Sequence, residues 1–216
     1  MKIYAEHRTR LHHRFFTTRT IFECTVKNMM GIRIFIAVEI TFDTQKKLAE
    51  IQDRLKESGA DVNWVAPGNL HITLKFIGTF DEEKIESVVS VMREAVSPGI
   101  PFDLCYRGVG ILPGNKNPRV VYAHAEDQEG ILTDIHKKLD EQLAVLGIER
   151  EGRPFKAHIT VGRIKTRKNI KKLIECVGLY NQSLFGMERI TELVLMKSEL
   201  SREGPVYTKL NSVSIS

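Results

Sequence analysis

The sequence predicts an α+β fold with two pseudo-symmetric lobes, each an antiparallel sheet with flanking helices, and an active-site cleft between the lobes. Strand-like and helix-like segments alternate along the chain, and several neighbouring strands are joined by short turns, as is typical of antiparallel sheets. A His-Ile-Thr tripeptide occurs twice on strand-like segments, at His71 and at His158. A chain of 216 residues is long enough for one domain built from two closely packed halves.

Composition and charge restrict the class of protein. A hydrophobic content of 42% and a charged content of 27% are typical of a soluble globular chain, and no apolar run approaches the roughly 18 residues of a membrane span. The three cysteines lie far apart in no metal-binding spacing, which predicts free thiols in a reducing compartment, and therefore a cytoplasmic protein. A net charge of +5 favours a polyanionic partner such as RNA, although charge alone is equally consistent with a merely basic protein.

The first 29 residues differ from the rest. They are rich in Arg and His, their only acidic residues are Glu6 and Glu23, and they show neither strand nor helix periodicity. They also lack the apolar stretch of a secretory signal. We expect residues 1–29 to be an N-terminal extension, or the product of an upstream start codon, in preference to a targeting peptide. The domain itself is expected to cover residues 30–216.

The first half of the domain is predicted to contain three strands and two helices. Ile32–Ile40 is almost continuously apolar, as in a buried strand. A helix over Gln45–Ser58 follows from the spacing of its apolar residues, with Asp43 or Thr44 as the cap and Gly59 as the end. The remaining expected elements are a short strand at Asn63–Val65, a strand from Leu70 that closes at Gly78, and a helix over Glu82–Val96 capped by Asp81.

The second half repeats this outline. Phe102–Leu112 and Arg119–Ala125 are predicted as a hairpin, and we place the boundary between the two halves in it. The other expected elements are a helix over Gln128–Leu146, a strand at the second His-Ile-Thr, a helix that ends near Gly178, and strands at Glu188–Leu200 and Val206–Ser214.

The two repeated tripeptides carry the chemistry. Side chains at i and i+2 of a strand leave the same face, so His71 shares a face with Thr73, and His158 shares one with Thr160. Two imidazoles with pKa values near neutrality can serve as general base and general acid, while two hydroxyls can bind an anion. A single His on a strand is usually structural, and His124 is interpreted in this way because it has no counterpart.

The longer contexts NLHITLKFIGTF and FKAHITVGRIK resemble the two HxTx signature motifs of the two-histidine (2H) phosphoesterase superfamily. Within it, the sequence is most similar to the RNA 2′,3′-cyclic phosphodiesterase branch, called LigT-like or 2′-5′ RNA ligase-like, from about Gly31 to about Leu210. The resemblance implies a hydrolase that needs no metal or other cofactor and converts a terminal RNA 2′,3′-cyclic phosphate to a 2′-phosphate. It also implies that His71 is the proton donor and His158 the proton acceptor.

For the residues that follow the motifs, the resemblance and the strand pattern differ. The resemblance implies that Arg163 assists Thr73 and Thr160 in binding phosphate. Strict alternation instead puts Arg163 and Phe76 on the face opposite the histidines, unless a bulge reverses it, and puts Lys75 on the histidine face. The basic stretch of residues 165–172 is either an RNA contact or a solvated surface.

The expected partner is RNA with a 2′,3′-cyclic phosphate end, including tRNA fragments, and the protein is expected to act as a monomer without membrane contact. Two alternatives stay open. One is 2′-5′ RNA ligation, the reverse reaction with an RNA 5′-hydroxyl in place of water. The other is a non-catalytic module that binds RNA ends or nucleotides.

Overall fold

The computed structural model describes residues 31–96, 99–202 and 204–215. The second of the two units of the chain, Ile32–Ser216, is compact and contains all the strands and helices named below. The predicted extension of residues 1–29, together with Cys24 in it, lies outside the described residues.

The described residues form nine strands and four α-helices. The strands are β1 (Ile32–Glu39), β2 (Val62–Trp64), β3 (His71–Phe80), β4 (Phe102–Leu112), β5 (Val120–Glu126), β6 (His158–Ile164), β7 (Leu184–Ile190), β8 (Glu192–Ser201) and β9 (Gly204–Ser214). The helices are α2 (Phe42–Lys56), α3 (Ile85–Val96), α4 (Ile131–Val145) and α5 (Ile170–Leu179), and the short 3-10 turns are η2 (Pro67–Asn69) and η3 (Glu82–Lys84).

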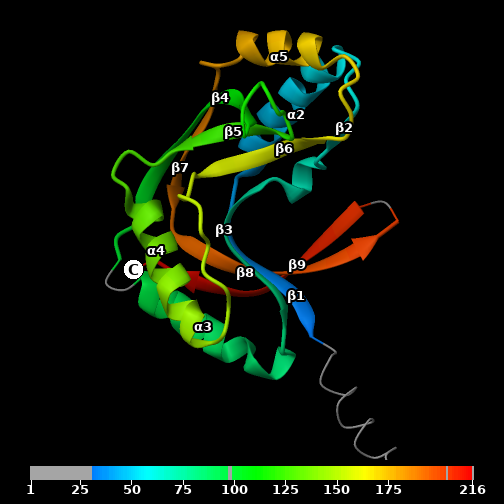
Figure 1. The fold of residues 1–216 in the computed structure, drawn as a ribbon. Helices are drawn as coiled ribbons and strands as arrows, with labels where there is room; N and C mark the ends of the chain where they lie inside the picture. The colour runs from blue at the N-terminus through cyan, green and yellow to red at the C-terminus, as the bar shows by residue number, and fades with distance from the viewer. Residues whose placement is uncertain (1–30, 97–98, 203, 216) are drawn as a thin grey trace, which may run out of the picture. The chain divides into compact units, whose positions relative to one another are not determined.

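The predicted α+β fold with two antiparallel lobes is confirmed, and the two sheets are joined into one curled sheet (Figure 1). Its strand order is β7-β4-β5-β6-β3-β1-β8-β9, with β2 paired to β6. The β1 lobe contains β1, β3, β8 and β9, whereas the β5 lobe contains β2, β4, β5, β6 and β7. Between the lobes, β3 and β6 pair at Ile72 and Ile159 only.

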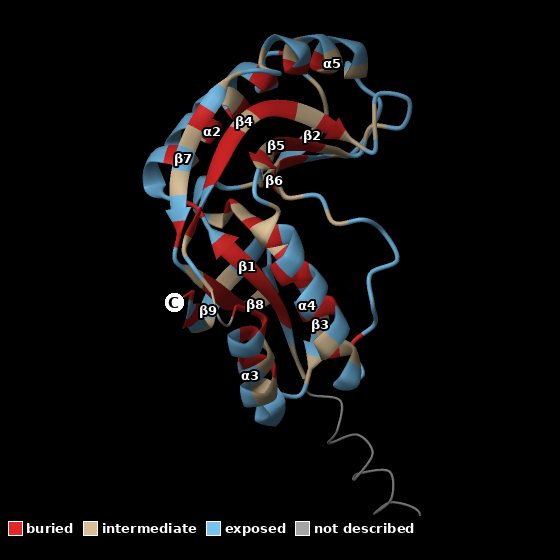
Figure 2. Ribbon diagram, turned by 90° about the vertical axis from the view of Figure 1, so that its left-hand side faces the viewer, coloured by how far each residue is buried: buried red, intermediate tan, exposed pale blue. Residues whose placement is uncertain are grey.

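The helices are exchanged between the lobes, as the figures show from two directions (Figures 1 and 2). Helix α2 follows β1 in the sequence but packs on β6, β7 and α5 of the other lobe. Helix α4 follows β5 but packs on α3 and β3 of the β1 lobe. The predicted boundary in the β4–β5 hairpin therefore divides the halves of the sequence but not the two lobes, because β4 and β5 pair with each other inside one lobe.

Two predicted elements have different bounds in the structure because of contacts with distant parts of the chain. Helix α2 begins at Phe42 with Thr41 as its cap, because the Glu188 carboxylate of β7 accepts hydrogen bonds from the Thr41 backbone N–H at 3.1 Å and from its hydroxyl at 2.5 Å. The predicted strand Glu188–Leu200 is two strands separated by Thr191. Strand β7 pairs with β4 at one edge of the sheet, whereas β8 pairs with β1 in the other lobe. In addition, β3 continues past Gly78, which adopts φ +83° at an irregularity in the pairing with β1.

The main core lies between the sheet and its four helices. Strand β1 is buried on both faces (Figure 2) because Ile34 and Ile36 enter that core, whereas Phe35 and Ala37 pack with Val194 and Met196 of β8 on the opposite face. That opposite face is the one that carries the histidines. No helix among the described residues is both long and apolar enough to cross a membrane. Cys105 and Cys176 are free thiols, as predicted for these two residues.

Candidate active site

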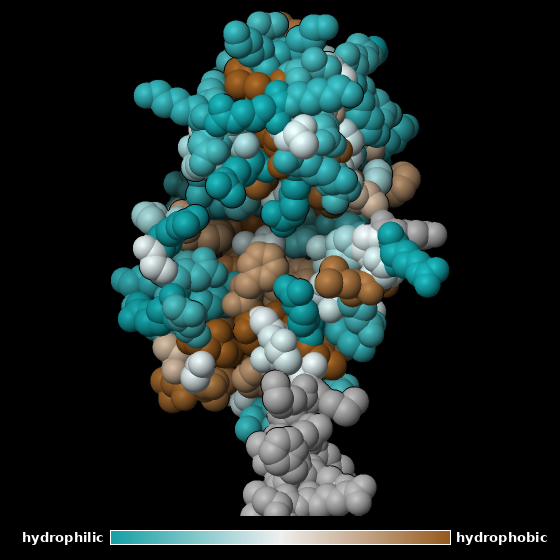
Figure 3. All heavy atoms as spheres, turned by 45° about the vertical axis from the view of Figure 1, so that its right-hand side comes forward, coloured by the Kyte–Doolittle hydropathy of each residue, from teal (hydrophilic) through white to brown (hydrophobic). Residues whose placement is uncertain are grey.

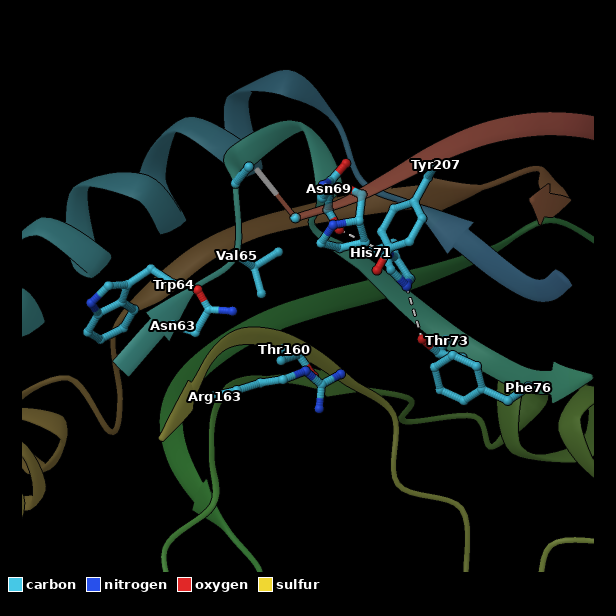
Figure 4. Close-up of a pocket in the computed structure, with 13 residues that line it drawn as sticks. Asn63, Trp64, Val65, Asn69, His71, Thr73, Phe76, Thr160, Arg163 and Tyr207 are labelled. Carbon is cyan, nitrogen blue, oxygen red and sulfur yellow. Dashed lines mark hydrogen bonds between the residues drawn. The ribbon is translucent and has the colours of Figure 1, made fainter. Parts of the chain in front are cut away.

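A pocket of about 170 Å³ lies where β3 and β6 face each other, and four of the five predicted site residues line it. His71 and Thr73 project from β3, and Thr160 and Arg163 project toward them from β6 (Figure 4). His158 is not among the lining residues. It lies two positions before Thr160 on β6, close enough to His71 for its charge to lower the pKa of that residue.

His71 is held with one ring nitrogen available for chemistry. Its Nδ1 lies 2.8 Å from the carbonyl oxygen of Asn69, and since a carbonyl can only accept, Nδ1 carries the proton. Its Nε2 lies 3.0 Å from the Thr73 hydroxyl (Figure 4). Burial lowers the pKa of His71, against the opposing effect of the Asn69 hydrogen bond, and the positive charge of Arg163 lowers it further. The free protein therefore favours neutral imidazole at this position.

His158 is oriented by the same local device. Its Nδ1 lies 2.7 Å from the carbonyl oxygen of Lys156, which is again the residue two positions earlier in the sequence. The His158 ring lies edge-on to Tyr122 at 5.6 Å between centroids, and the Lys156 ammonium donates to the Tyr122 hydroxyl at 2.8 Å. Both histidines thus use Nδ1 for anchoring and leave Nε2 for chemistry.

Matching β-bulges decide which side chains reach the pocket. In β3, Lys75 pairs with Ile36 and Thr73 pairs with Ala37, so Leu74 is an additional residue. In β6, Gly162 and Thr160 pair with neighbouring residues of β5, so Val161 is an additional residue in the same way. Beyond each bulge, a side chain therefore points to the face of the sheet opposite to the one that strict alternation from the histidine assigns to it.

The bulges correct three expectations from strict alternation. Phe76 and Arg163, each five positions after its histidine, both line the pocket instead of facing away from it. Lys75 does not face the groove: it is 1% exposed and lies on the core side of the sheet. Gly162 occupies the equivalent position in β6, where a Cβ atom would come within 2.9 Å of the Trp64 ring.

The buried Lys75 ammonium organises the loop that leads into β6. It donates to the Asp140 carboxylate of α4 at 2.6 Å and to the Glu149 carbonyl at 2.7 Å. The same carboxylate accepts hydrogen bonds from the Glu151 backbone N–H at 2.9 Å and from Arg150 Nε at 3.3 Å. Burial alone would raise the pKa of Asp140, but these hydrogen bonds and the Lys75 charge outweigh it and hold the pKa below its ordinary value.

A second contact joins the first bulge to the same loop. His136 of α4 is buried, and its Nδ1 lies 2.9 Å from the carbonyl oxygen of Leu74, the additional residue of the bulge. Its ring stacks on Phe155, three positions before His158, at 4.3 Å between centroids. The core side of β3 and the approach to the second histidine are therefore one packed unit.

Several residues that line the pocket were not predicted, since they come from elements without a motif. Tyr207 of β9 lies edge-on to His71 at 5.3 Å, and both Tyr207 and Phe76 contact the ring of Phe35. Asn63 of β2 lies opposite Arg163 in the β2–β6 pairing and also lines the pocket. Nothing in the local sequence around Tyr207 marks it as a site residue.

His124, interpreted as structural, lies on the same face as the second histidine and directly opposite it in the β5–β6 pairing. Its ring contacts Tyr122 at 4.7 Å, and burial lowers its pKa. No group of three or more His, Cys, Asp or Glu side chains is arranged to hold a metal ion within the part of the chain that the structure describes.

Comparison with known proteins gives consistent matches over nearly the whole second unit. A family model described as LigT like Phosphoesterase matches residues 38–122 and 125–207. A protein of Methanothermobacter thermautotrophicus named RNA 2′,3′-cyclic phosphodiesterase is 36% identical over 181 residues, covering 84% of this chain and 97% of the relative. A protein of the same name from Archaeoglobus fulgidus is 37% identical, covering 83% and 98%. The crystal structure of TT0787 of Thermus thermophilus superimposes with a TM-score of 0.70 at 28% identity, covering 85% of this chain and 98% of that one.

Proposed function

Because the chain belongs to the LigT-like phosphoesterase family, we propose that it is an RNA 2′,3′-cyclic phosphodiesterase that hydrolyses the cyclic end to a 2′-phosphate. The observation that carries this proposal is the pair of His-x-Thr strands facing each other, with Arg163 beside them in the same pocket. The relatives at 36% and 37% identity carry that enzyme name over nearly their whole length.

The proposed chemistry is an in-line displacement at phosphorus. His158 Nε2 accepts a proton from water as the water oxygen attacks, and His71 Nε2 donates a proton to O3′ as the P–O3′ bond breaks. The two groups must lie on opposite sides of the phosphorus, which placement on facing strands allows. Thr73, Thr160 and Arg163 are proposed to stabilise the negative charge on the non-bridging oxygens. The phosphate then remains on O2′.

The terminal nucleoside is proposed to occupy the pocket beside Phe76 and Tyr207. Both rings are braced by Phe35, and an aromatic face that is already fixed can stack on a nucleobase with little loss of conformational entropy. We propose that the RNA end, including those of tRNA fragments, is met in the cytoplasm by a monomer of this chain.

The identity of the product tests this function. Incubation with an oligoribonucleotide that ends in a 2′,3′-cyclic phosphate is expected to give the 2′-phosphate end, identified by chromatography against synthetic 2′- and 3′-phosphate standards. A 3′-phosphate product would mean that the ribose binds in the reverse orientation, and the roles of the two histidines would have to be exchanged. Addition of an RNA with a 5′-hydroxyl to the same assay detects ligation as a longer product.

Hydrolysis is expected to be independent of metal ions. The motif strands supply imidazole and hydroxyl groups, and a Thr hydroxyl is a poor ligand for transition metals. We expect full activity after dialysis against EDTA, with unchanged rates on addition of Mg²⁺, Mn²⁺ or Zn²⁺. Loss of turnover in EDTA that a single metal restores would refute this prediction.

A further inference from the structure

Five basic side chains form an exposed edge at the end of β6, next to the pocket. This basic rim consists of Lys165, Arg167 and Lys168 from the β6–α5 loop with Lys116 and Arg119 from the β4–β5 loop. All five residues are exposed, and none of them forms an ion pair with another residue that the structure describes. Figure 3 shows that the lobe carrying α5 is covered largely by hydrophilic side chains on the face it displays.

Hydrogen bonds connect the two loops of the rim to each other and to the end of β6. The Arg167 guanidinium donates to the Lys116 carbonyl at 3.4 Å, and the Ile164 backbone N–H donates to the Arg119 carbonyl at 2.9 Å. Lys165 follows directly after the end of β6, two positions beyond Arg163, which lines the pocket. Thr160 and Lys165 are separated by about 16 Å at the usual rise of a strand, a span of several nucleotides.

We propose that the basic rim binds the phosphates of the RNA chain on the 5′ side of the terminal nucleotide, so that the protein prefers oligonucleotides to mononucleotides. This inference rests on the proposed function. With the cyclic phosphate between the histidines and the terminal nucleoside in the pocket, the rest of the chain has to leave the pocket at one end. Exposed cations without carboxylate partners attract phosphate without first breaking an ion pair.

The other direction along the sheet is less suited to a polyanion. Beyond His158, a hollow of about 290 Å³ is lined by Lys156 and Arg107, but also by the acidic residues Glu126 and Asp127. Arg107 Nε already lies 3.6 Å from the Glu126 carboxylate. The charges there compensate each other, whereas those of the rim do not. The RNA chain therefore runs toward the rim, and water reaches phosphorus from the His158 side.

The test is a triple variant, Lys165→Gln, Arg167→Gln and Lys168→Gln. Its matched control is Lys46→Gln, Lys47→Gln and Lys137→Gln, which removes the same charge from exposed helix positions without ion pairs to described residues. Hydrolysis is measured from low to high KCl with a nucleoside 2′,3′-cyclic phosphate and with a ten-nucleotide RNA that ends in the same group. Circular dichroism confirms that all variants fold.

With the ten-nucleotide RNA, we expect the rim variant to lose about tenfold in kcat/KM at low salt. The slope of log kcat/KM against log salt concentration should also become shallower by about 2, since each of the three lost phosphate contacts to a single strand contributes about 0.7 to the slope. With the nucleoside cyclic phosphate, rim variant, control and wild type are expected to be equal. Equal loss and slope in rim variant and control with RNA would overturn the inference while leaving the proposed function intact. A wild-type protein that hydrolyses neither substrate would overturn both.

Discussion

Replacement of His71 or His158 by alanine is expected to lower kcat/KM by about a hundredfold or more, since a positioned general acid or base typically contributes that much. The two imidazoles are proposed to act in one step, so the double variant should lose much less than the product of the single losses. Hydrolysis of a nucleoside 2′,3′-cyclic phosphate by the four proteins measures this. A single variant that keeps a rate near that of the wild type would remove that histidine from the mechanism.

The pH dependence separates the two roles. As the proton donor, His71 has to be protonated, so kcat/KM falls as the pH rises through the His71 pKa. Because burial lowers this pKa, the alkaline limb of the profile should lie below about 6.5, the ordinary value for histidine. If His71 were the acceptor, the same lowered pKa would instead set the acidic limb, and kcat/KM would fall as the pH decreases through the His71 pKa.

A substrate with a better leaving group provides the matching control. When sulfur replaces O3′ of the cyclic phosphate, the leaving group needs no proton from the enzyme. The Ala variant at position 71 should then recover most of its loss, whereas the Ala variant at position 158 should not, because water activation is still required. Recovery of the second variant alone would exchange the two assignments.

Replacement of Asp140 by asparagine is expected to destabilise the fold by about 3–5 kcal/mol at pH 7, because it removes the nearest carboxylate from the buried Lys75 ammonium and leaves only that of Glu151, at 3.9 Å. For a chain of this size, that loss lowers Tm by roughly 6–20 °C. Thermal or urea unfolding followed by circular dichroism measures it. The matched control is Asp53→Asn, which breaks the exposed Lys56–Asp53 pair at 2.7 Å and should cost about 1 kcal/mol or less.

Two further measurements identify the buried charge as the cause. Adding Lys75→Met to Asp140→Asn should cost less than the two single losses together, since the second change removes a buried charge that has already lost its nearest partner. The folded-state pKa of Asp140 lies below its unfolded value, so the contribution of its carboxylate is present above about pH 4 and is lost as the pH falls through the folded-state pKa. The difference in stability between wild type and variant should shrink accordingly. A loss at pH 7 no larger than that of the Asp53 control would contradict this account.

The alternation of strand-like and helix-like segments was enough to predict the fold class. The repeated tripeptide was enough to place each histidine on the same face as its threonine, because the period of two in a strand assigns faces locally. That rule holds from His71 to Thr73 and from His158 to Thr160. It fails at Leu74 and Val161, where the partner strand lacks a matching residue. A bulge is a property of a pair of strands, and the sequence of one strand does not encode it. The burial of Lys75 could not be predicted for the same reason, since its partner Asp140 lies on a helix from the other half of the chain.

The exchange of helices between the lobes and the division of the predicted strand at Thr191 could not be predicted for a similar reason. The apolar stripe of α2 specifies that the helix packs on a sheet but not on which lobe, and contacts such as Thr41 with Glu188 join residues far apart in the sequence. Strand β7 was fused with β8 in the prediction because both are strand-like and one residue separates them. Their separate partners, β4 and β1, follow only from the three-dimensional pairing.

Within the sheet, the two lobes are joined by a single residue pair, and this has a mechanical consequence. Ile72 and Ile159 each directly follow a motif histidine, so His71 and His158 sit at the narrow bridge of the curled sheet. If one lobe rocks against the other, this bridge is the natural pivot, and points near a pivot move least. Such motion would widen or narrow the outer pocket, where Phe76, Tyr207 and the basic rim lie, while the separation of the two imidazoles stayed nearly constant. The enzyme could then admit and release RNA ends of different shape without a change in the distance between the two imidazoles that transfer protons.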